Sequence, residues 1–288
     1  MRAQLLNGKS IAKSIQHSLK EEISYLVNQY QIRPKLASIQ IGNNEIINTY
    51  AEAQKDLTSY LGIDFQLHCI KKEVNQRKVI DLINDLNDDK TITAIILLLP
   101  LPEGFKQKEI ISSIAPSKDA EGIHPVNLGK LFYKKEDNLS DLIVPCTVEA
   151  VMQLLDYTKV QLKGKEVIVI SHSEIIGKPL SILLLNRLAT VTVCHIKTKD
   201  LRKHIQDAEI VISATGKANL IKGEWIKDKA IVIDIGTSKV GSKIVGDVEF
   251  EKAKDYASFI TPVPGGVGPL TVSMLMRNIV KLYKLQRR

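Results

Sequence analysis

The segment Val167-Ile-Val-Ile-Ser-His-Ser-Glu-Ile-Ile-Gly-Lys-Pro179 has the pattern of a buried strand, a turn of small and polar residues, and a helix that starts near its proline. Backbone N–H groups and the helix dipole at such a helix start attract phosphate. Only Gly177 of a full G-x-G-x-x-G fingerprint is present. Dinucleotide binding and a plain strand-to-helix turn are therefore both open on this segment alone.

Strands and helices alternate on the carboxyl side of this segment. We expect strands at Val167–Ile170, Thr190–Cys194, Ile210–Ser213 and Ala230–Ile235, and helices at Pro179–Leu188 and Leu201–Ala208. This series predicts a doubly wound parallel sheet, whose ligand crevice lies at the carboxyl ends of the strands. No acidic residue stands at the tip formed by Cys194 and His195, where a standard NAD site holds the ribose.

A second α/β series precedes it. We expect helices at Gly8–Gln31, Asn48–Leu61 and Val79–Leu86, and strands at Leu36–Ile41, Phe65–Ile70 and Thr93–Leu99. The polar stretch at residues 134–141 has the composition of a linker or excursion. Amphipathic helices are expected after it at Glu149–Leu155 and at the end of the chain at Val272–Leu285.

Composition narrows the class of protein. The chain has 288 residues, and 40 Lys and Arg against 32 Asp and Glu give a formal net charge of +8. The basic residues are scattered among acidic ones and aromatic residues make up only 5%, which disfavours nucleic acid as a partner. No apolar run has the length of a membrane span, and we expect no membrane partner. The three cysteines show no metal-site spacing, so we expect a reduced, cytoplasmic protein without a metal site.

The stretch Thr261-Pro-Val-Pro-Gly-Gly-Val-Gly-Pro-Leu-Thr271 is the second unusual segment. Its prolines and glycines fix an uncommon backbone path that allows close approach of another group. A ligand-lining loop and a purely structural loop are both open readings of it.

Several separate motifs, which run almost from end to end of the chain, point to one family. They are Asn7-Gly-Lys9, Tyr50, Leu99-Pro-Leu-Pro102, Pro116-Ser-Lys-Asp-Ala-Glu-Gly-Ile-His-Pro-Val-Asn-Leu-Gly-Lys130, Pro145-Cys-Thr147, Ala214-Thr-Gly-Lys217, Gly246-Asp-Val-Glu-Phe250 and the loop that begins at Thr261. On these motifs the chain resembles the methylenetetrahydrofolate dehydrogenase/cyclohydrolase family, the bifunctional FolD proteins, as a divergent member.

The resemblance implies an α/β protein of two three-layer α/β/α domains with a cleft between them. It implies a folate-type substrate domain at residues 1–140 plus 270–288, to which the last helix returns, and a Rossmann NAD(P)-binding domain at residues 141–269. It further implies NAD or NADP as cofactor, a tetrahydrofolate derivative as small-molecule partner, and a homodimer.

The catalytic positions that the resemblance implies are Tyr50, Gln54, Leu98 and Glu121. The family carries a Lys one helical turn after the Tyr, where this chain has Gln54. Lys55 lies about 100° further round the helix and is not expected to replace it. An amine titrates and a carboxamide does not, so the hydrolytic step of the family loses its titratable group here.

Two further positions of the folate site depart from the family. Leu98 stands where the family has a Gln that partners the Lys, and Glu121 stands where it has a pterin-binding Asp. The substrate-binding positions implied are Tyr50, Leu99, Glu121, Pro262, Gly265 and Gly266.

The cofactor half departs as well. The implied cofactor-binding positions are Ser171, His172, Ser173, Gly177, His195, Ile196, Thr215, Gly216 and Thr237. His172 replaces an Arg that helps to hold the 2′-phosphate of NADP, and is a weaker, pH-dependent substitute. Ile196 replaces a Ser and cannot donate a hydrogen bond to phosphate, and Thr237 replaces an Ile. These changes weaken NADP binding or shift the preference toward NAD.

Two classes of function remain open. The first is a dehydrogenase of this family in which the cyclohydrolase reaction is impaired or lost, since hydride transfer needs mainly juxtaposition of cofactor and substrate. The second is a diverged paralogue, either an enzyme for another pterin-like or one-carbon substrate or a ligand-binding protein without catalysis.

Overall fold

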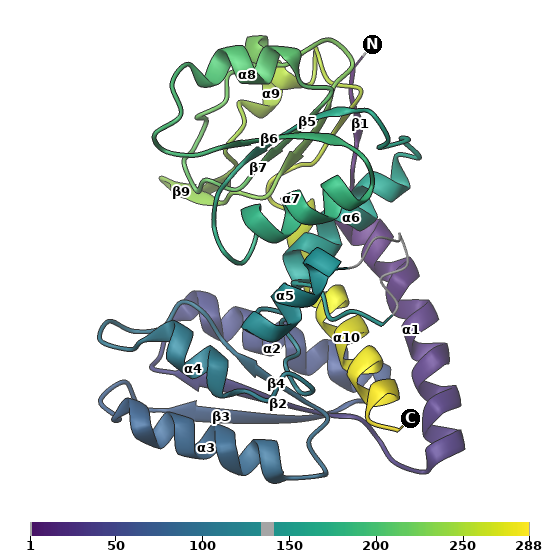
Figure 1. The fold of residues 1–288 in the computed structure, drawn as a ribbon, viewed down its shortest axis with the longest axis vertical. Coiled ribbons are helices and arrows are strands. Elements are labelled where there is room, and N and C mark those ends of the chain that lie inside the picture. The colour runs from purple at the N-terminus through teal and green to yellow at the C-terminus, as the bar shows by residue number, and fades with distance from the viewer. Residues whose placement is uncertain (1, 134–140, 288) are drawn as a thin grey trace. The chain divides into compact units, whose positions relative to one another are not determined.

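The computed structural model describes residues 2–133 and 141–287 of the chain, which divides into two compact units (Figure 1). The six-strand unit comprises Met1–Lys13, Leu131–Asp137 and Thr147–Thr271, and the three-strand unit comprises Ser14–Lys130, Asn138–Cys146 and Val272–Arg288. In the described residues, no helix combines the length and apolar character needed to cross a membrane. The expected linker at 134–141 falls almost wholly outside the described residues.

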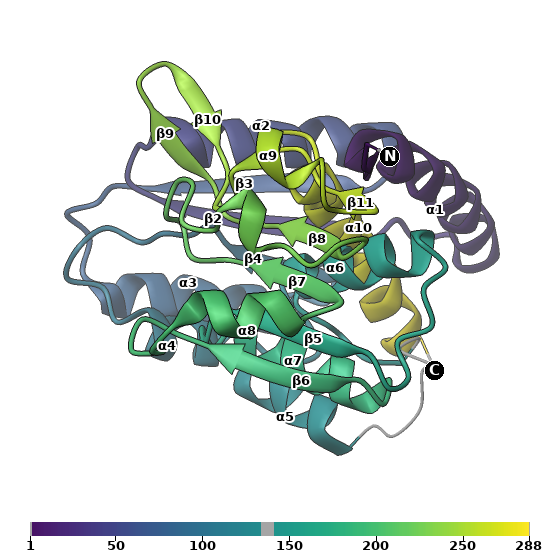
Figure 2. The ribbon, with the colours of Figure 1, turned by 90° about the horizontal axis from the view of Figure 1, so that it is seen from above.

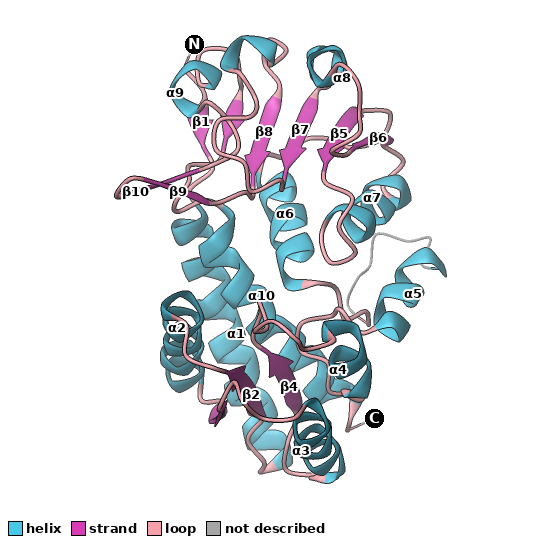
Figure 3. Ribbon diagram, turned by 90° about the vertical axis from the view of Figure 1, so that its left-hand side faces the viewer, coloured by secondary structure: helices cyan, strands magenta, loops and turns pink. Residues whose placement is uncertain are grey.

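The six-strand unit is built on a parallel sheet in the order β1-β11-β8-β7-β5-β6. Figure 3 shows β8, β7 and β5 side by side and pointing the same way. The strands are β1 (Gln4–Leu5), β5 (Glu166–Ile170), β6 (Thr190–Cys194), β7 (Ile210–Ser213), β8 (Ile231–Asp234) and β11 (Phe259–Ile260). A separate antiparallel hairpin of β9 (Ser238–Val240) and β10 (Lys243–Val245) follows β8. Because parallel strands end at one edge, the turns after β5, β6 and β7 lie together.

Both faces of this sheet are covered. Ile168 of β5 and Val211 of β7 pack in one buried cluster with Ile205 of helix α8 and Ala253 of helix α9. Val169 and its neighbours on the opposite face are buried too, which explains why the strands are apolar throughout. The other helical elements with residues here are α6 (Cys146–Tyr157), α7 (Gly177–Asn186), α8 (Leu201–Asp207), η1 (Gly223–Trp225) and α9 (Phe250–Ala253).

The three-strand unit holds a parallel sheet in the order β3-β2-β4. Its strands are β2 (Lys35–Ile41), β3 (Asp64–Ile70) and β4 (Ala94–Leu97). Figures 2 and 3 show helix α2 (Glu45–Leu61) on one face and helices α3 (Gln76–Asp88) and α4 (Gln107–Ser113) on the other. Helices α1 (Gly8–Tyr30), α5 (Pro125–Tyr133) and α10 (Val267–Leu285) contribute residues to both units, as does α6. The expectation of two α/β domains with parallel sheets is confirmed.

The bounds differ from expectation in places with identifiable causes. Residues 1–13 were expected in the first domain, but they group with the six-strand unit because β1 pairs with β11. Strands β1 and β11 have two residues each, which is too short for a period to show. The last helix begins at Val267, five residues earlier than expected, so the glycine-rich loop runs directly into its first turn.

Candidate functional site

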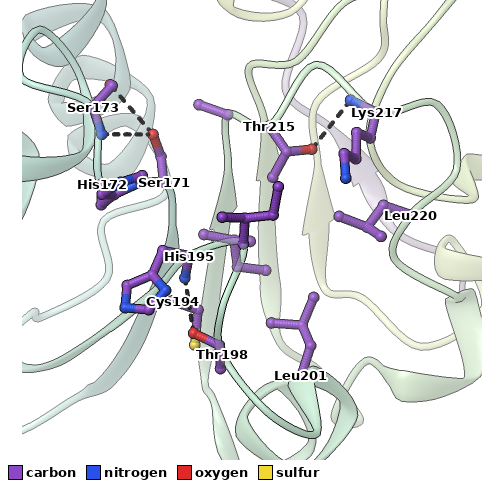
Figure 4. Close-up of a pocket in the computed structure, with 13 residues that line it drawn as sticks. Ser171, His172, Ser173, Cys194, His195, Thr198, Leu201, Thr215, Lys217 and Leu220 are labelled. Atoms are coloured by element: carbon purple, nitrogen blue, oxygen red, sulfur yellow. Dashed lines mark hydrogen bonds between the residues drawn. The ribbon is translucent and has the colours of Figure 1, made fainter.

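A cavity of about 460 Å³ opens at the carboxyl ends of β5, β6 and β7 in the six-strand unit. Figure 4 shows side chains from all three strand ends facing it. Its walls are formed by Ile170, Ser171, His172, Ser173, Cys194, His195, Ile196, Thr198, Leu201, Ala214, Thr215, Lys217 and Leu220. A cavity at this edge of a doubly wound sheet is where ligands bind in such folds.

The turn after β5 forms one wall of the cavity. The Ser173 hydroxyl accepts hydrogen bonds from the N–H groups of Ile176 (3.2 Å) and Gly177 (3.3 Å), so it joins the turn after β5 to the start of α7. A Cβ at Gly177 would lie 2.0 Å from the Ser171 carbonyl oxygen. Glycine therefore lets the helix begin directly against the turn, which brings the helix start to the cavity edge.

Two imidazoles face the cavity from neighbouring strand ends. The rings of His172 and His195 have centroids 5.4 Å apart (Figure 4). Nδ1 of His195 accepts a 3.1 Å hydrogen bond from the N–H of Lys197, which leaves Nε2 of the neutral ring as its donor. Ile196 also lines the cavity and is 77% exposed, so it adds apolar surface and no donor at the rim.

The remaining cofactor positions lie after β7 and β8. Thr215 lines the cavity, and Gly216 follows it with φ +65° in the turn that leads to Lys217. Thr237 is exposed, follows β8 and is not among the residues of the cavity wall. Eight of the nine expected cofactor positions thus lie on the turns or helix start at the cavity edge, and Thr237 stands apart from the wall.

In the three-strand unit, Tyr50 and Gln54 lie one turn apart on α2. Gln54 is fully buried, and its Oε1 accepts a 3.0 Å hydrogen bond from the hydroxyl of Ser38 on β2. Its Nε2 has no hydrogen-bond partner within the described part of the chain. Leu98 is 2% exposed just beyond β4 and has no polar group. Lys55 is exposed to solvent, so its amine does not take the place of the missing lysine.

Glu121 lies in a turn that is fixed by its neighbour Asp119. The Asp119 carboxylate accepts hydrogen bonds from the N–H of Gly122 (3.0 Å), the N–H of His124 (2.9 Å) and Nδ2 of Asn127 (2.9 Å). Residues 118–120 run beside β4, with Asp119 bridged to Ile95. These bonds hold the backbone of the turn from which the Glu121 side chain extends.

Tyr50 and Glu121 are both half-buried, and desolvation has the largest effect on the pKa of each. It raises the pKa of Glu121 to about 8, with a further rise from the Asp119 charge. Burial also raises the pKa of Tyr50 well above its usual range, and the charges of Glu121 and Cys146 raise it further. The Gln54 side chain lowers the same pKa, but by less. At neutral pH the Glu121 carboxyl therefore carries a proton and Tyr50 remains a phenol. The two groups offer neutral hydrogen-bond donors.

The glycine- and proline-rich loop belongs to the six-strand unit. The Gly8 N–H donates to the Gly265 carbonyl at 3.0 Å, and a Cβ at Gly8 would lie 1.7 Å from the Gly266 carbonyl oxygen. Gly265 has φ +107°, a conformation that favours glycine. The loop with Pro262 is thus packed against the start of α1. Leu99, another expected substrate position, is half-buried beyond β4 in the three-strand unit.

Some residues at the two sites were not expected from the sequence. Ser38 bonds to Gln54. In the sequence it is marked only by being a polar residue among the apolar residues of strand β2. Leu201 and Leu220 line the cavity, and no local pattern marks them. Lys217 also lines it and ends the Ala214–Lys217 motif, but it was not among the expected cofactor positions. In the described residues no group of His, Cys, Asp and Glu is arranged to hold a metal ion.

Comparison with known proteins identifies the family of both units. Residues 6–121 match the catalytic domain of tetrahydrofolate dehydrogenase/cyclohydrolase, and residues 145–287 match its NAD(P)-binding domain. A bifunctional protein FolD from Hydrogenobaculum sp. is 43% identical over 280 residues, which cover 97% of this chain and 98% of the relative. Another from Nitratiruptor sp. is 41% identical and covers 99% of each chain.

Solved structures of FolD enzymes have the same fold as this chain. The bifunctional FolD enzyme of Campylobacter jejuni superposes with a TM-score of 0.94 at 39% identity, covering 99% of both chains. The FolD of Trypanosoma brucei, solved with NADP cofactor and inhibitor, superposes with a TM-score of 0.95 at 38% identity and covers 100% of this chain and 99% of that one. The chain therefore belongs to the tetrahydrofolate dehydrogenase/cyclohydrolase family.

Proposed function

We propose that the chain is a 5,10-methylenetetrahydrofolate dehydrogenase in which the cyclohydrolase activity is impaired or lost. The observation that carries this proposal is the buried carboxamide of Gln54, whose oxygen is bonded to Ser38 and whose Nε2 lacks a partner in the described residues. Adding water to a methenyl carbon requires a group that takes up and releases a proton, and a carboxamide does neither.

The cavity residues fit a dinucleotide. The cavity lies at the carboxyl ends of three parallel strands and offers hydroxyls from Ser171 and Thr215, two imidazoles and the ammonium group of Lys217. The nicotinamide of NAD(P)⁺, when bound, accepts the hydride from the methylene carbon. The task of the protein in that step is positioning, which does not require the missing lysine.

The residues of the three-strand unit are suited to hold a heterocycle. Glu121 is protonated at neutral pH and both donates and accepts a hydrogen bond, as the edge of a pterin requires. Tyr50 adds a phenol donor one turn from Gln54. Together these groups support binding and orientation of the folate without proton transfer to water.

Cofactor preference follows from the same cavity. Neither His172 nor Ile196 offers the fixed, bidentate charge with which an arginine holds a phosphate. We therefore infer that the enzyme discriminates weakly in favour of NADP, or prefers NAD.

The test is an assay on the purified chain. Methylenetetrahydrofolate is offered with NAD⁺ and, separately, with NADP⁺, and the formation of reduced cofactor is followed. Hydride transfer with at least one cofactor is expected. If neither cofactor is reduced although calorimetry shows that a folate binds, the chain is a ligand-binding or repurposed paralogue.

We also propose that the chain forms a homodimer. Light scattering at the concentration used in the assay gives the mass that tests this.

A further inference from the structure

Two buried carboxyl groups lie behind the cavity and are not part of its wall. Asp247 is fully buried and Asp234 is 3% exposed. Asp234 ends strand β8, and Asp247 follows the β9–β10 hairpin. Buried carboxyl groups are costly unless they are bonded, so their partners indicate what they are for.

The Asp247 carboxylate holds the turn that follows β7. Its Oδ2 accepts hydrogen bonds from the Ser213 hydroxyl at 2.7 Å and from the Thr215 N–H at 2.6 Å, and its Oδ1 accepts one from the Lys217 N–H at 3.0 Å. Two of these three donors are backbone groups of residues that line the cavity. The carboxylate thus sets the path of the chain through one wall of the cavity from behind.

Asp234 in turn fixes Asp247. Its Oδ1 accepts from the Asp247 N–H at 3.0 Å and its Oδ2 accepts from the Val248 N–H at 2.8 Å. The two carboxyl groups fill space that two glycines leave open, because a Cβ at Gly236 would lie 2.0 Å from Oδ1 of Asp247 and a Cβ at Gly246 would lie 2.0 Å from Oδ2 of Asp234. The hydrogen bonds of Asp234 and Asp247 therefore join the ends of β7 and β8 to the segment after the hairpin.

We infer that Asp247 is a positioning residue for NAD(P) binding, which acts through the backbone of Thr215 and Lys217 and makes no contact with the cofactor itself. A carboxylate suits this task because both its oxygens accept, whereas an asparagine in its place turns an amide donor toward one of the N–H groups. The inference depends on NAD(P) binding alone and is independent of the proposal about cyclohydrolase activity.

Two variants separate positioning from general stability. D247N disturbs the bonds to Thr215 and Lys217, and S213A removes the third bond to the same carboxylate while leaving the turn bonded. Dissociation constants for NADH and NADPH are measured by cofactor fluorescence, alongside urea unfolding. We expect D247N to weaken binding of both cofactors by about tenfold. We expect S213A to change binding by less than about twofold although it also lowers stability.

Binding that weakens equally in S213A and D247N, or that is unchanged in D247N, overturns the inference. Should D247N fail to fold, hydrogen exchange on the unmodified protein decides. If Asp247 holds the turn before the cofactor binds, the Thr215 and Lys217 amides are protected from exchange in the cofactor-free protein. Unprotected exchange of both amides contradicts the inference. Both experiments measure binding or exchange, so they give an answer even if the chain transfers no hydride.

Discussion

The Ser38 hydroxyl donates a 3.0 Å hydrogen bond to Oε1 of Gln54, which orients a fully buried carboxamide at the position where the family's catalytic lysine is expected. A strand residue thereby fixes a helix residue in the interior of the three-strand unit.

Gln54→Lys alone should not restore full methenyl hydrolysis. The new amine would be buried, and Leu98, where the family has a Gln that partners the Lys, offers it no polar group. Burial without a partner lowers the pKa of an ammonium group and costs stability. The double variant with Leu98→Gln should recover more activity, because it adds a partner for the amine. Rates of methenyl hydrolysis are compared with those of Lys55→Gln, which alters an exposed residue of the same helix and should match the parent. Full recovery in the single variant would show that Leu98 is irrelevant.

Arginine at position 172 should increase the preference for NADP. A guanidinium at the turn after β5 supplies a charge-assisted bond to the 2′-phosphate, which is worth about 1.5–3 kcal/mol or roughly tenfold or more in affinity. The measurement is the ratio of the dissociation constants for NADP⁺ and NAD⁺ in His172→Arg, with His172→Gln as the uncharged control. A ratio that is the same in both variants would place the 2′-phosphate elsewhere.

Glu121 should make activity and stability depend on pH in a defined direction. Its pKa is about 8 in the folded protein against an ordinary value of 4.5, so the folded state holds a proton that the unfolded state has released across this window. The stability that Glu121 contributes is therefore fully present below pH 4.5 and is lost as the pH rises toward 8, by at most about 1.4 kcal/mol per pH unit. Asp234, with a pKa of about 7, contributes in the same direction.

The variant that isolates this effect is Glu121→Gln, which keeps a neutral polar group at all pH values. Its unfolding free energy should lose less on going from pH 5 to pH 8 than that of the parent. In the parent, kcat/KM for the folate should decline above about pH 8 as the carboxyl ionises. A decline of the same shape in Glu121→Gln would assign the titration to another group.

Gly177→Ala should disrupt the turn at the start of α7. The added methyl would meet the Ser171 carbonyl oxygen at 2.0 Å, so the helix start must move away from the cavity. We expect a loss of stability of about 2 kcal/mol or more and a clear loss of cofactor affinity. Gly129→Ala is the matched control, since a Cβ in that helical position meets no atom within 4 Å. Denaturant midpoints and cofactor titrations of the two variants give the comparison.

Much of the fold was predictable because its strands are short, apolar and bounded by turn residues. The expected bounds of β6 and β7 match the structure residue for residue, and that of β5 differs by one. Helix geometry also places Gln54 inside and Lys55 outside, as the angular offset between successive residues requires. Strand β1 has only two residues, both exposed, so it shows no alternation of apolar and polar residues. It is recognisable as a strand only through its pairing with β11.

The parts of the site that escaped prediction depend on contacts between distant segments. Asp234 and Asp247 are 13 residues apart and meet only because the hairpin returns the chain to the end of β8. Ser38 and Gln54 belong to different elements, and their hydrogen bond follows from the packing of α2 on β2. Sequence spacing carries no information about such pairs, whereas the family resemblance locates Gln54 but not its partner.

The most direct test of the central claim follows both products during one dehydrogenase reaction. Reduced cofactor and methenyltetrahydrofolate are quantified together in the purified enzyme, at a pH where spontaneous hydrolysis of the methenyl group is slow. The loss of the lysine predicts that methenyltetrahydrofolate accumulates in near-equal amount to the reduced cofactor. Reduced cofactor without accumulation of the methenyl product, and with formation of the formyl product instead, would contradict the claim that Gln54 has cost this chain its cyclohydrolase.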